Sequence, residues 1–145
     1  MVSLANHKET LMFLAYLDDW IQNLPVRKLN EMIVKPEKTA IISVDVTKGF
    51  CSIGPLASPR VAGIVVPIVE LMERAWNAGV RHIILSQDTH EPDAVEFSAW
   101  PPHCIRGTIE SETVDEIRRL TFFDQMMVLE KNSIASGLHH DLQQW

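Results

Sequence analysis

The amino-acid sequence predicts an α/β fold with three layers (α/β/α), in which a parallel, Rossmann-like sheet lies between helices. Three short runs rich in β-branched and other apolar residues have the length and composition of strands that are buried on both faces. A stretch of helical period separates the first two runs, which is the order of a βαβ unit with a right-handed crossover. Together these two observations indicate the fold class.

Length, composition and charge limit the possible partners. The chain has 145 residues, of which 46% are hydrophobic, and this is enough to build one packed core. The formal net charge is -6 and no Lys/Arg run gathers locally, so we expect no nucleic-acid partner. The most apolar early stretch, residues 11–17, stops at Asp18, far short of the roughly 20 residues that span a bilayer, so we expect no membrane span.

Cysteine usage points to a cellular compartment. The sequence contains only two cysteines, which form no paired framework, and nothing at the N-terminus resembles a secretory leader. A reducing cytoplasm is the expected location.

Residues 1–38 are predicted to form an N-terminal helical extension. Apolar residues recur at three- and four-residue steps from Leu11 to Leu24, which predicts an amphipathic helix that Pro25 ends. The polar stretch 27–38 contains Pro36 and is expected to connect this helix to the main domain, residues 39–145.

The first βαβ unit begins with a predicted strand at residues 40–46, followed by a loop rich in Gly, Pro and Ser at 47–59. An apolar stripe then predicts a helix over residues 61–79, in which Pro67 must either cause a kink or lie in the first turn. The second strand is expected at residues 80–86.

A second unit follows after a long loop. The pattern predicts a polar-faced helix over residues 110–120 and a third strand over residues 126–130. Leu138, Leu142 and Trp145 indicate the start of a further helix, which stops in mid-pattern. We therefore expect the sheet to be incomplete in this chain.

Charged side chains stand where the three predicted strands end. Asp45 lies at the end of the first strand, Asp88 just beyond the second and Lys131 just beyond the third. Ligands of open parallel sheets bind outside these carboxyl ends. Taken singly, each residue is more simply explained as a turn former, a helix cap or a solvated charge. Asp45 is the exception, because an ionised carboxylate in an apolar run needs a compensating partner, for which Lys131 is a candidate.

Two carboxylates and two imidazoles follow the second strand and could converge on one metal ion. They are Asp88, His90, Glu96 and His103. Mixed nitrogen and oxygen ligands favour zinc, iron or manganese over calcium or magnesium. The alternative is a surface loop with scattered polar residues. The rigid segment 100–102, Trp-Pro-Pro, lowers the entropy cost of holding His103 in place and favours the metal, so we expect one divalent ion.

These motifs resemble a known family. Residues 86–90 (Ser-Gln-Asp-Thr-His), followed by 100–108 (Trp-Pro-Pro-His-Cys-Ile-Arg-Gly-Thr), resemble the nicotinamidase branch of the isochorismatase-like cysteine hydrolases. The Trp-Pro-Pro-His-Cys run with its following Gly-Thr is highly specific. Residues 42–51 resemble the family's first strand with its catalytic aspartate, and residues 129–131 resemble the strand that bears its catalytic lysine. The resemblance covers about residues 39–145.

The resemblance implies an isochorismatase-like hydrolase fold and a role for each site residue. Asp45 would be the general base that activates a cysteine thiol, and Lys131 would stabilise the charges around it. Asp88, His90 and His103 would be metal ligands, and Glu96 would be the fourth, at a position where many members have histidine. Phe50 and Trp100 would flank the aromatic ring of a small carboxamide substrate such as nicotinamide.

Two departures from the family pattern matter. Residues 47–49 read Thr-Lys-Gly where the family commonly has Gln-Asn-Asp, which leaves the choice of substrate open. The family's nucleophilic cysteine lies beyond its fourth strand, and Cys51 and Cys104 match other positions. We therefore expect a C-terminally truncated chain that is inactive alone and that forms a homo-oligomer or pairs with a complementing C-terminal half.

Two other functions compete with the amidase. One is a non-catalytic module for metal binding or protein interaction that is derived from the same fold. The other is a metal-free, isochorismatase-type ether hydrolase, which the Asp-x-His and Pro-Pro-His residues argue against.

Overall fold

The computed structural model describes residues 4–134, and the chain divides into two compact units, one up to Met32 and one from Ile33 onward. The first unit contains helix α1 (Leu4–Gln22) and the short helix α2 (Leu29–Met32). Helix α1 confirms the predicted N-terminal helix but begins before Leu11. It ends where the Asn23 side chain donates hydrogen bonds to the backbone and side chain of Asp19. No described helix is both long and apolar enough to cross a bilayer.

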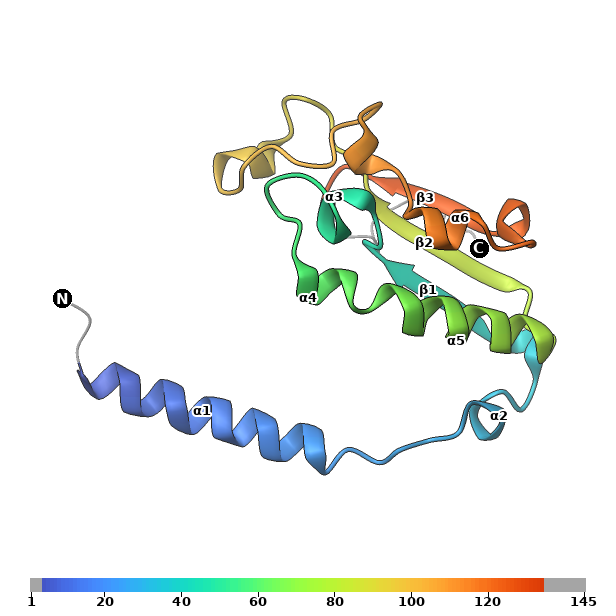
Figure 1. Ribbon diagram of the computed structural model, residues 1–145, viewed down its shortest axis with the longest axis horizontal. Coiled ribbons are helices and arrows are strands. Elements are labelled where there is room, and N and C mark those ends of the chain that lie inside the picture. Colours follow the sequence, from blue (N-terminus) through green and yellow to red (C-terminus); the bar gives the residue numbers. More distant parts are fainter. Residues whose placement is uncertain (1–3, 135–145) are drawn as a thin grey trace. The chain divides into compact units, whose positions relative to one another are not determined.

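The second unit is built on a three-stranded parallel sheet (Figure 1). Its strands are β1 (Ala40–Val44), β2 (His82–Asp88) and β3 (Met127–Lys131), in the order β1-β2-β3. All three predicted strands are thus present, with ends shifted by up to two residues. Because the strands are parallel, their carboxyl ends lie at the same edge of the sheet, as the sequence predicts.

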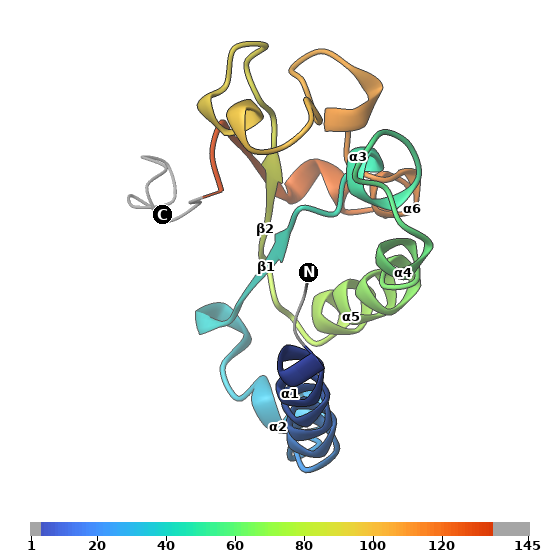
Figure 2. The same cartoon turned by 90° about the vertical axis from the view of Figure 1, so that its left-hand side faces the viewer.

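Helices α5 (Val65–Asn77) and α6 (Asp115–Arg118) cover one face of the sheet (Figure 2). The core between them and the strands is apolar, and Met72 and Ile117 within it are fully buried. Trp76 and Phe122 stack at its margin with ring centroids 4.4 Å apart. The structure therefore confirms the α/β class. The segment 138–145, predicted to start a further helix, lies outside the described residues.

The predicted helix 61–79 consists of two helices. The short helix α4 (Pro59–Ala62) begins at Ser58, whose side chain accepts a hydrogen bond from the Val61 N–H, and α5 starts after a turn. Pro67 is the third residue of α5, so it lies in the first turn, which is one of the two positions that the sequence allows. The break precedes Pro67 because proline has no N–H to bond the carbonyl four residues earlier.

The predicted helix 110–120 is wrong over its first part, and only residues 115–118 form an α-helix. The structure has a 3-10 turn at Ile109–Ser111, extended backbone at Glu112 and Val114, and only then the single turn of α6. Thr113 forms an isolated antiparallel bridge with Thr47, and its hydroxyl donates a hydrogen bond to the buried side chain of Gln87 at 2.8 Å. These long-range contacts outweigh a helical propensity that is weak in so short a segment.

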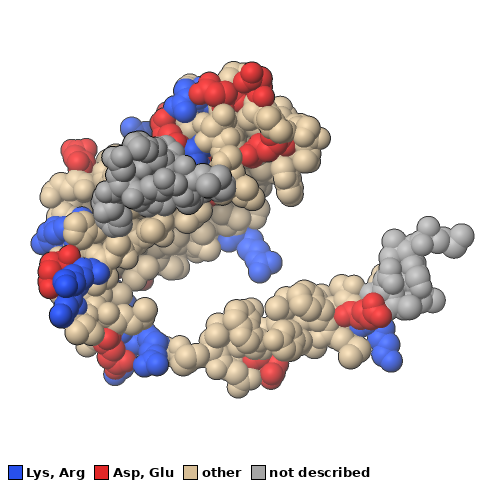
Figure 3. Space-filling view, turned by 180° about the vertical axis from the view of Figure 1, so that it is seen from behind, with Lys and Arg blue, Asp and Glu red and all other residues tan. Residues whose placement is uncertain are grey.

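Charged side chains of both signs are interspersed on the face shown in Figure 3. One surface cluster joins Arg106 to Glu91 at 2.7 Å and also to Glu130.

Candidate active site at the strand ends

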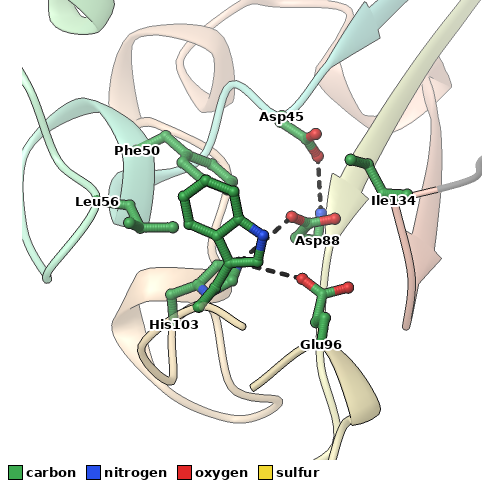
Figure 4. Close-up of a pocket in the computed structure, with 8 residues that line it drawn as sticks. Asp45, Phe50, Leu56, Asp88, Glu96, His103 and Ile134 are labelled. Atoms are coloured by element: carbon green, nitrogen blue, oxygen red, sulfur yellow. Dashed lines mark hydrogen bonds and ion pairs between the residues drawn. The ribbon is translucent and has the colours of Figure 1, made fainter. Parts of the chain in front are cut away.

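Asp45 follows the last residue of β1 and takes a left-handed backbone conformation, with a φ of 57°. Its N–H donates to the Ser86 carbonyl at 2.8 Å, and its carboxylate accepts the Asp88 N–H at 3.0 Å (Figure 4). Burial, together with the charge of Asp88, raises the pKa of Asp45 above its ordinary value, although Lys131 opposes this shift. The carboxyl group is therefore fixed in place and is a stronger base than a solvated aspartate.

Lys131 is the last residue of β3 and is only 3% exposed. Its ammonium lies 3.0 and 3.2 Å from the two carboxylate oxygens of Asp45 and also contacts Asp88. Burial by itself lowers the pKa of Lys131, but the hydrogen bonds to Asp88 and Asp45 raise it overall. Lys131 is therefore a cation that forms an ion pair with Asp45, the carboxylate for which it was a candidate partner in the sequence.

The four residues selected from the sequence as metal ligands lie together. Asp88 ends β2 and Glu96 belongs to the 3-10 turn Val95–Ser98, while His90 stands in the loop before this turn and His103 in the loop after it. One nitrogen or oxygen atom from each lies within 4.8 Å of the others. His90 Nε2 is 3.1 Å from Glu96 Oε1 and 3.4 Å from Asp88 Oδ2, while His103 Nε2 is 3.5 and 3.7 Å from the same two oxygens.

The chemistry of this cluster fits a divalent cation. His90 is fully buried, and neither of its ring nitrogens has a hydrogen-bond partner, although Nε2 lies close to two carboxylates. A buried imidazole without a hydrogen bond is costly unless something else satisfies it. His103 Nδ1 lies 2.8 Å from the Pro101 carbonyl, a contact that requires a proton on Nδ1 and leaves the Nε2 lone pair facing the cluster.

Backbone contacts hold the loops that carry the two histidines side by side. The His90 N–H donates to the Cys104 carbonyl at 3.0 Å, and the Arg106 N–H donates to the His90 carbonyl at 2.8 Å. His90 and Ile105 therefore form a parallel bridge beyond the end of the sheet. In this way β2 positions His103, which lies well outside any strand.

A cavity of about 270 Å³ opens beside two groups of residues. One is the pair of Asp45 and Lys131, called here the acid-base pair, and the other is the cluster of Asp88, His90, Glu96 and His103. This volume is near the lower end of the roughly 300–1,000 Å³ typical of small-molecule pockets. The lining residues are Asp45, Phe50, Leu56, Asp88, Glu96, Trp100, His103 and Ile134. Figure 4 shows Phe50 and Leu56 on one side of the acidic groups and Ile134 on the other.

Three apolar residues that contribute to the cavity or to the packing of the histidines were not selected from the sequence. Leu56 and Ile134 line the cavity, and Phe97 packs edge-on against His90 and His103 with ring centroids 5.4 and 5.6 Å apart. All three stand in loops or irregular turns, where no hydrophobic period marks a residue as buried or cavity-lining. No signal in the sequence could have identified them.

Neither cysteine lines the cavity. Cys51 is 6% exposed and Cys104 is fully buried. Burial is the main cause that raises the pKa of Cys104 to about 11, and burial also raises the pKa of Cys51. Both side chains are therefore neutral thiols near pH 7, which are poor nucleophiles.

The parallel sheet thus carries a buried Asp-Lys pair and a cavity at its carboxyl edge. Residues 39–145 match the family model described as the Isochorismatase domain. The chain belongs to the isochorismatase family, and the resemblance inferred from its motifs is confirmed.

Individual relatives are similar over part of their length. The chain is 30% identical to Nicotinamidase 1 of Arabidopsis thaliana over 142 residues, which cover 90% of this chain and 53% of that protein. The N-carbamoylsarcosine amidase structure from Thermoplasma acidophilum matches with a TM-score of 0.64 and 30% identity, over 72% of this chain and 58% of that one. The pyrazinamidase of Pyrococcus horikoshii in complex with zinc shares the fold, with a TM-score of 0.56 and 23% identity, over 65% of this chain and 51% of that one. The chain thus spans about half the length of the curated relatives it matches.

Proposed function

We propose that this chain provides the acid-base pair, the metal site and part of the substrate pocket of a nicotinamidase-like amidase, which converts nicotinamide or a related small carboxamide to the acid and ammonia. One observation carries the proposal. A single cavity is lined by Asp45, whose carboxylate pairs with Lys131, and by the aromatic side chains of Phe50 and Trp100. Three of the four clustered residues, Asp88, Glu96 and His103, line the same cavity.

Asp88, His90, Glu96 and His103 would hold one ion of zinc, iron or manganese. When bound, such an ion supplies a positive charge that anchors a polar atom of the substrate ring and thereby orients the carboxamide. The zinc complex of the Pyrococcus horikoshii pyrazinamidase supports this proposal, and so does the unsatisfied imidazole of His90.

Asp45 would act as the general base. Its raised pKa brings it closer to that of a thiol, so it accepts a proton more readily than a solvated aspartate does. Lys131 would stay protonated and stabilise the negative charge on Asp45 and then on the thiolate that attacks the amide carbon. Release of ammonia from the tetrahedral intermediate leaves a thioester, which water hydrolyses to the acid and the free thiol.

The walls of the cavity suit a flat, aromatic amide. Phe50 lies edge-on to His103, with ring centroids 5.6 Å apart, and Trp100 lines the same space. A planar ring between these side chains would have its polar substituents near Asp45 and the cluster. The small volume favours a substrate of one ring.

The thiol itself must come from elsewhere, because the two cysteines of this sequence are buried away from the cavity. The same observation favours a second candidate function, a non-catalytic metal-binding module. The two functions differ in whether the cavity binds a carboxamide.

Ligand-observed NMR on the zinc-loaded chain tests this difference. We expect nicotinamide to bind, and benzamide, which lacks the ring nitrogen, to bind more weakly. Trp100→Ala should weaken nicotinamide binding, whereas Trp20→Ala, on α1, serves as the matched control. If zinc binds but nicotinamide does not, the amidase proposal is wrong and the metal-binding module is favoured.

A further inference from the structure

Glu110 contacts the backbone directly after His103. It lies in the 3-10 turn Ile109–Ser111, and its carboxylate accepts a hydrogen bond from the Cys104 N–H at 3.1 Å. Glu110 is not one of the four clustered residues, so it does not face the proposed ion. Its carboxylate is linked to the cluster by the hydrogen bond to Cys104, the residue next to His103.

Cys104 is held in an uncommon conformation. Its φ is 44°, in the left-handed region that residues other than glycine rarely adopt. Its thiol lies 3.5 Å from the Thr47 hydroxyl and donates to the Glu110 backbone carbonyl at 3.6 Å. Glu110 therefore holds Cys104 from two sides, through its carboxylate and through its carbonyl, and the surroundings keep the strained residue in place.

Two glycines leave space for this arrangement. A Cβ atom on Gly54, whose φ is +90°, would lie 2.6 Å from Cδ of Glu110. A Cβ atom on Gly49 would lie 2.5 Å from the Cys104 sulfur and 3.0 Å from the Glu110 carbonyl oxygen. The loop after β1 thus fits closely around Glu110 and Cys104, and only glycine permits this fit at both positions.

We propose that Glu110 is a positioning residue that fixes His103 for metal binding by bonding the Cys104 N–H. The proposal rests on the metal site of the proposed function and adds a residue outside that site. Cys104, in its left-handed conformation, turns the chain between His103 and Ile105, and Ile105 forms the β-bridge with His90. A shift of Cys104 would therefore move His103 relative to His90. Residues that orient metal ligands in this way typically change affinity about 10- to 100-fold when they are replaced.

Zinc affinity of the full chain, measured by competition with a chromophoric chelator, tests the proposal. Glu110→Ala is expected to bind zinc about 10- to 100-fold more weakly than the parent. Glu110→Gln, whose amide oxygen still accepts the Cys104 N–H, should recover most of the affinity. Glu112→Ala is the matched control, because Glu112 stands two residues on and its side chain bonds Lys48 and Arg118 instead.

A second pair of variants approaches Glu110 from the other side. Gly54→Ala should displace the Glu110 carboxylate and weaken zinc binding in the same direction. Gly79→Ala is its control, because Gly79 also has a positive φ, of +97°, but its neighbour is Pro36. If Glu110→Ala fails to fold, the comparison of Gly54→Ala with Gly79→Ala tests whether Glu110 positions His103.

The outcomes separate the two proposals. If the parent binds no zinc, the proposed metal site fails, and the role of Glu110 fails with it. If the parent binds zinc and Glu110→Ala binds it equally well, only the positioning role is wrong. A purely structural role would lower the melting temperature of the metal-free Glu110→Ala protein while leaving the zinc-induced increase unchanged, and that result would also overturn the proposal.

Discussion

At the scale of single residues, Asp88 joins the two halves of the site. One of its carboxylate oxygens contacts Lys131, and the other faces the imidazoles of His90 and His103. Its N–H in turn donates to Asp45. The acid-base pair and the cluster therefore share one buried carboxylate, and a charge placed in the cluster changes the field at Lys131 and Asp45.

Removing the charge of Asp45 should affect chemistry and leave the metal in place. Asp45 is not among the clustered residues, and asparagine tolerates the same left-handed backbone. In a form of the protein that is supplied with its thiol, we expect Asp45→Asn to lower kcat by about 10²- to 10⁴-fold. Elemental analysis should give the same metal content as the parent. Loss of metal would place Asp45 in the coordination shell, and unchanged turnover would remove it from the mechanism.

Protein purified without chelator should contain about one equivalent of zinc, iron or manganese per chain, because two imidazoles and two carboxylates form a nearly complete coordination shell. His103→Ala should lose most of this metal, since it removes one of the two nitrogen ligands. His7→Ala, on the exposed surface of α1, is the control, because it removes a histidine that is not part of the cluster. The proposed site is wrong if the His103 variant keeps the metal content of the parent.

At the scale of elements, the first part of the segment that the sequence assigned to a helix, residues 110–114, instead leads to α6 and pairs with the chain directly after β1. The Lys48 ammonium bonds Glu112 and Asp115, each at 2.9 Å, and the Lys48 N–H donates to the Glu112 carbonyl. These contacts hold α3 (Lys48–Cys51) against the stretch between Ser111 and α6. Phe50, which lines the cavity, belongs to the same short helix.

The pH dependence of stability should report this ion cluster. Hydrogen bonds from Lys48 lower the pKa of Glu112 and of Asp115 below their ordinary values of 4.5 and 3.8, and the same bonds raise the pKa of Lys48 above 10.5. Because the carboxyl pKa values are lower in the folded state, their contribution is present above about pH 4.5 and is lost as the pH falls through the lowered values. The contribution of Lys48 is complete below 10.5 and is lost above it.

We therefore expect Lys48→Met to reduce the urea midpoint near neutral pH. The reduction should become smaller as the pH falls below the ordinary carboxyl pKa values of 4.5 and 3.8 and the two carboxylates become protonated. The effect at neutral pH should be small, because Glu112 and Asp115 are exposed to solvent and salt. Urea titrations of parent and variant at several pH values measure it. A difference between the two proteins that is independent of pH would contradict an electrostatic origin.

The sequence predicted the elements whose signals are local. The runs that form β1, β2 and β3 each contain at least three consecutive apolar residues, so their strand character and their shared carboxyl edge could be inferred without contacts. Asp45, Asp88 and Lys131 were found by the same reasoning, because their positions follow from strand ends. Thr113 shows the limit, since its pairing with Thr47 depends on residues far away in the chain. The contact of Phe97 with the histidines and the place of Ile134 in the cavity wall could not be predicted for the same reason.

At the scale of the whole molecule, β1 is one of the two edge strands of the described sheet. It pairs with β2 along one edge, and no described strand lies along the other. Ile42 and Val44 on this strand are 50% and 54% exposed. Apolar edge strands without charge or proline tend to pair with other chains.

We predict that the isolated chain self-associates and releases no ammonia from nicotinamide. Association follows from the open edge of β1, and inactivity follows from the absence of a thiol in the cavity. Sedimentation velocity with an ammonia-release assay measures both. Ile42→Lys should reduce association, because a charge on an edge strand opposes pairing, while Val26→Lys, on an exposed residue of the first unit, serves as control. A monodisperse monomer would show that β1 does not cause self-association. Turnover that survives both Cys51→Ala and Cys104→Ala would show that no cysteine is required.

The alignment of β2 with β3 has a consequence for how the chain reaches its native state. Asp88 stands opposite Lys131, and Gln87 stands opposite Glu130. If β3 paired one residue out of step, Glu130 would take the place of Lys131 beside Asp88, and two carboxylates would meet without a cation while the core side chains of β3 turned to the opposite face. The incorrect alignment would be penalised by charge as well as by packing, so the ion pair between Asp88 and Lys131 also selects the correct register of the sheet during folding.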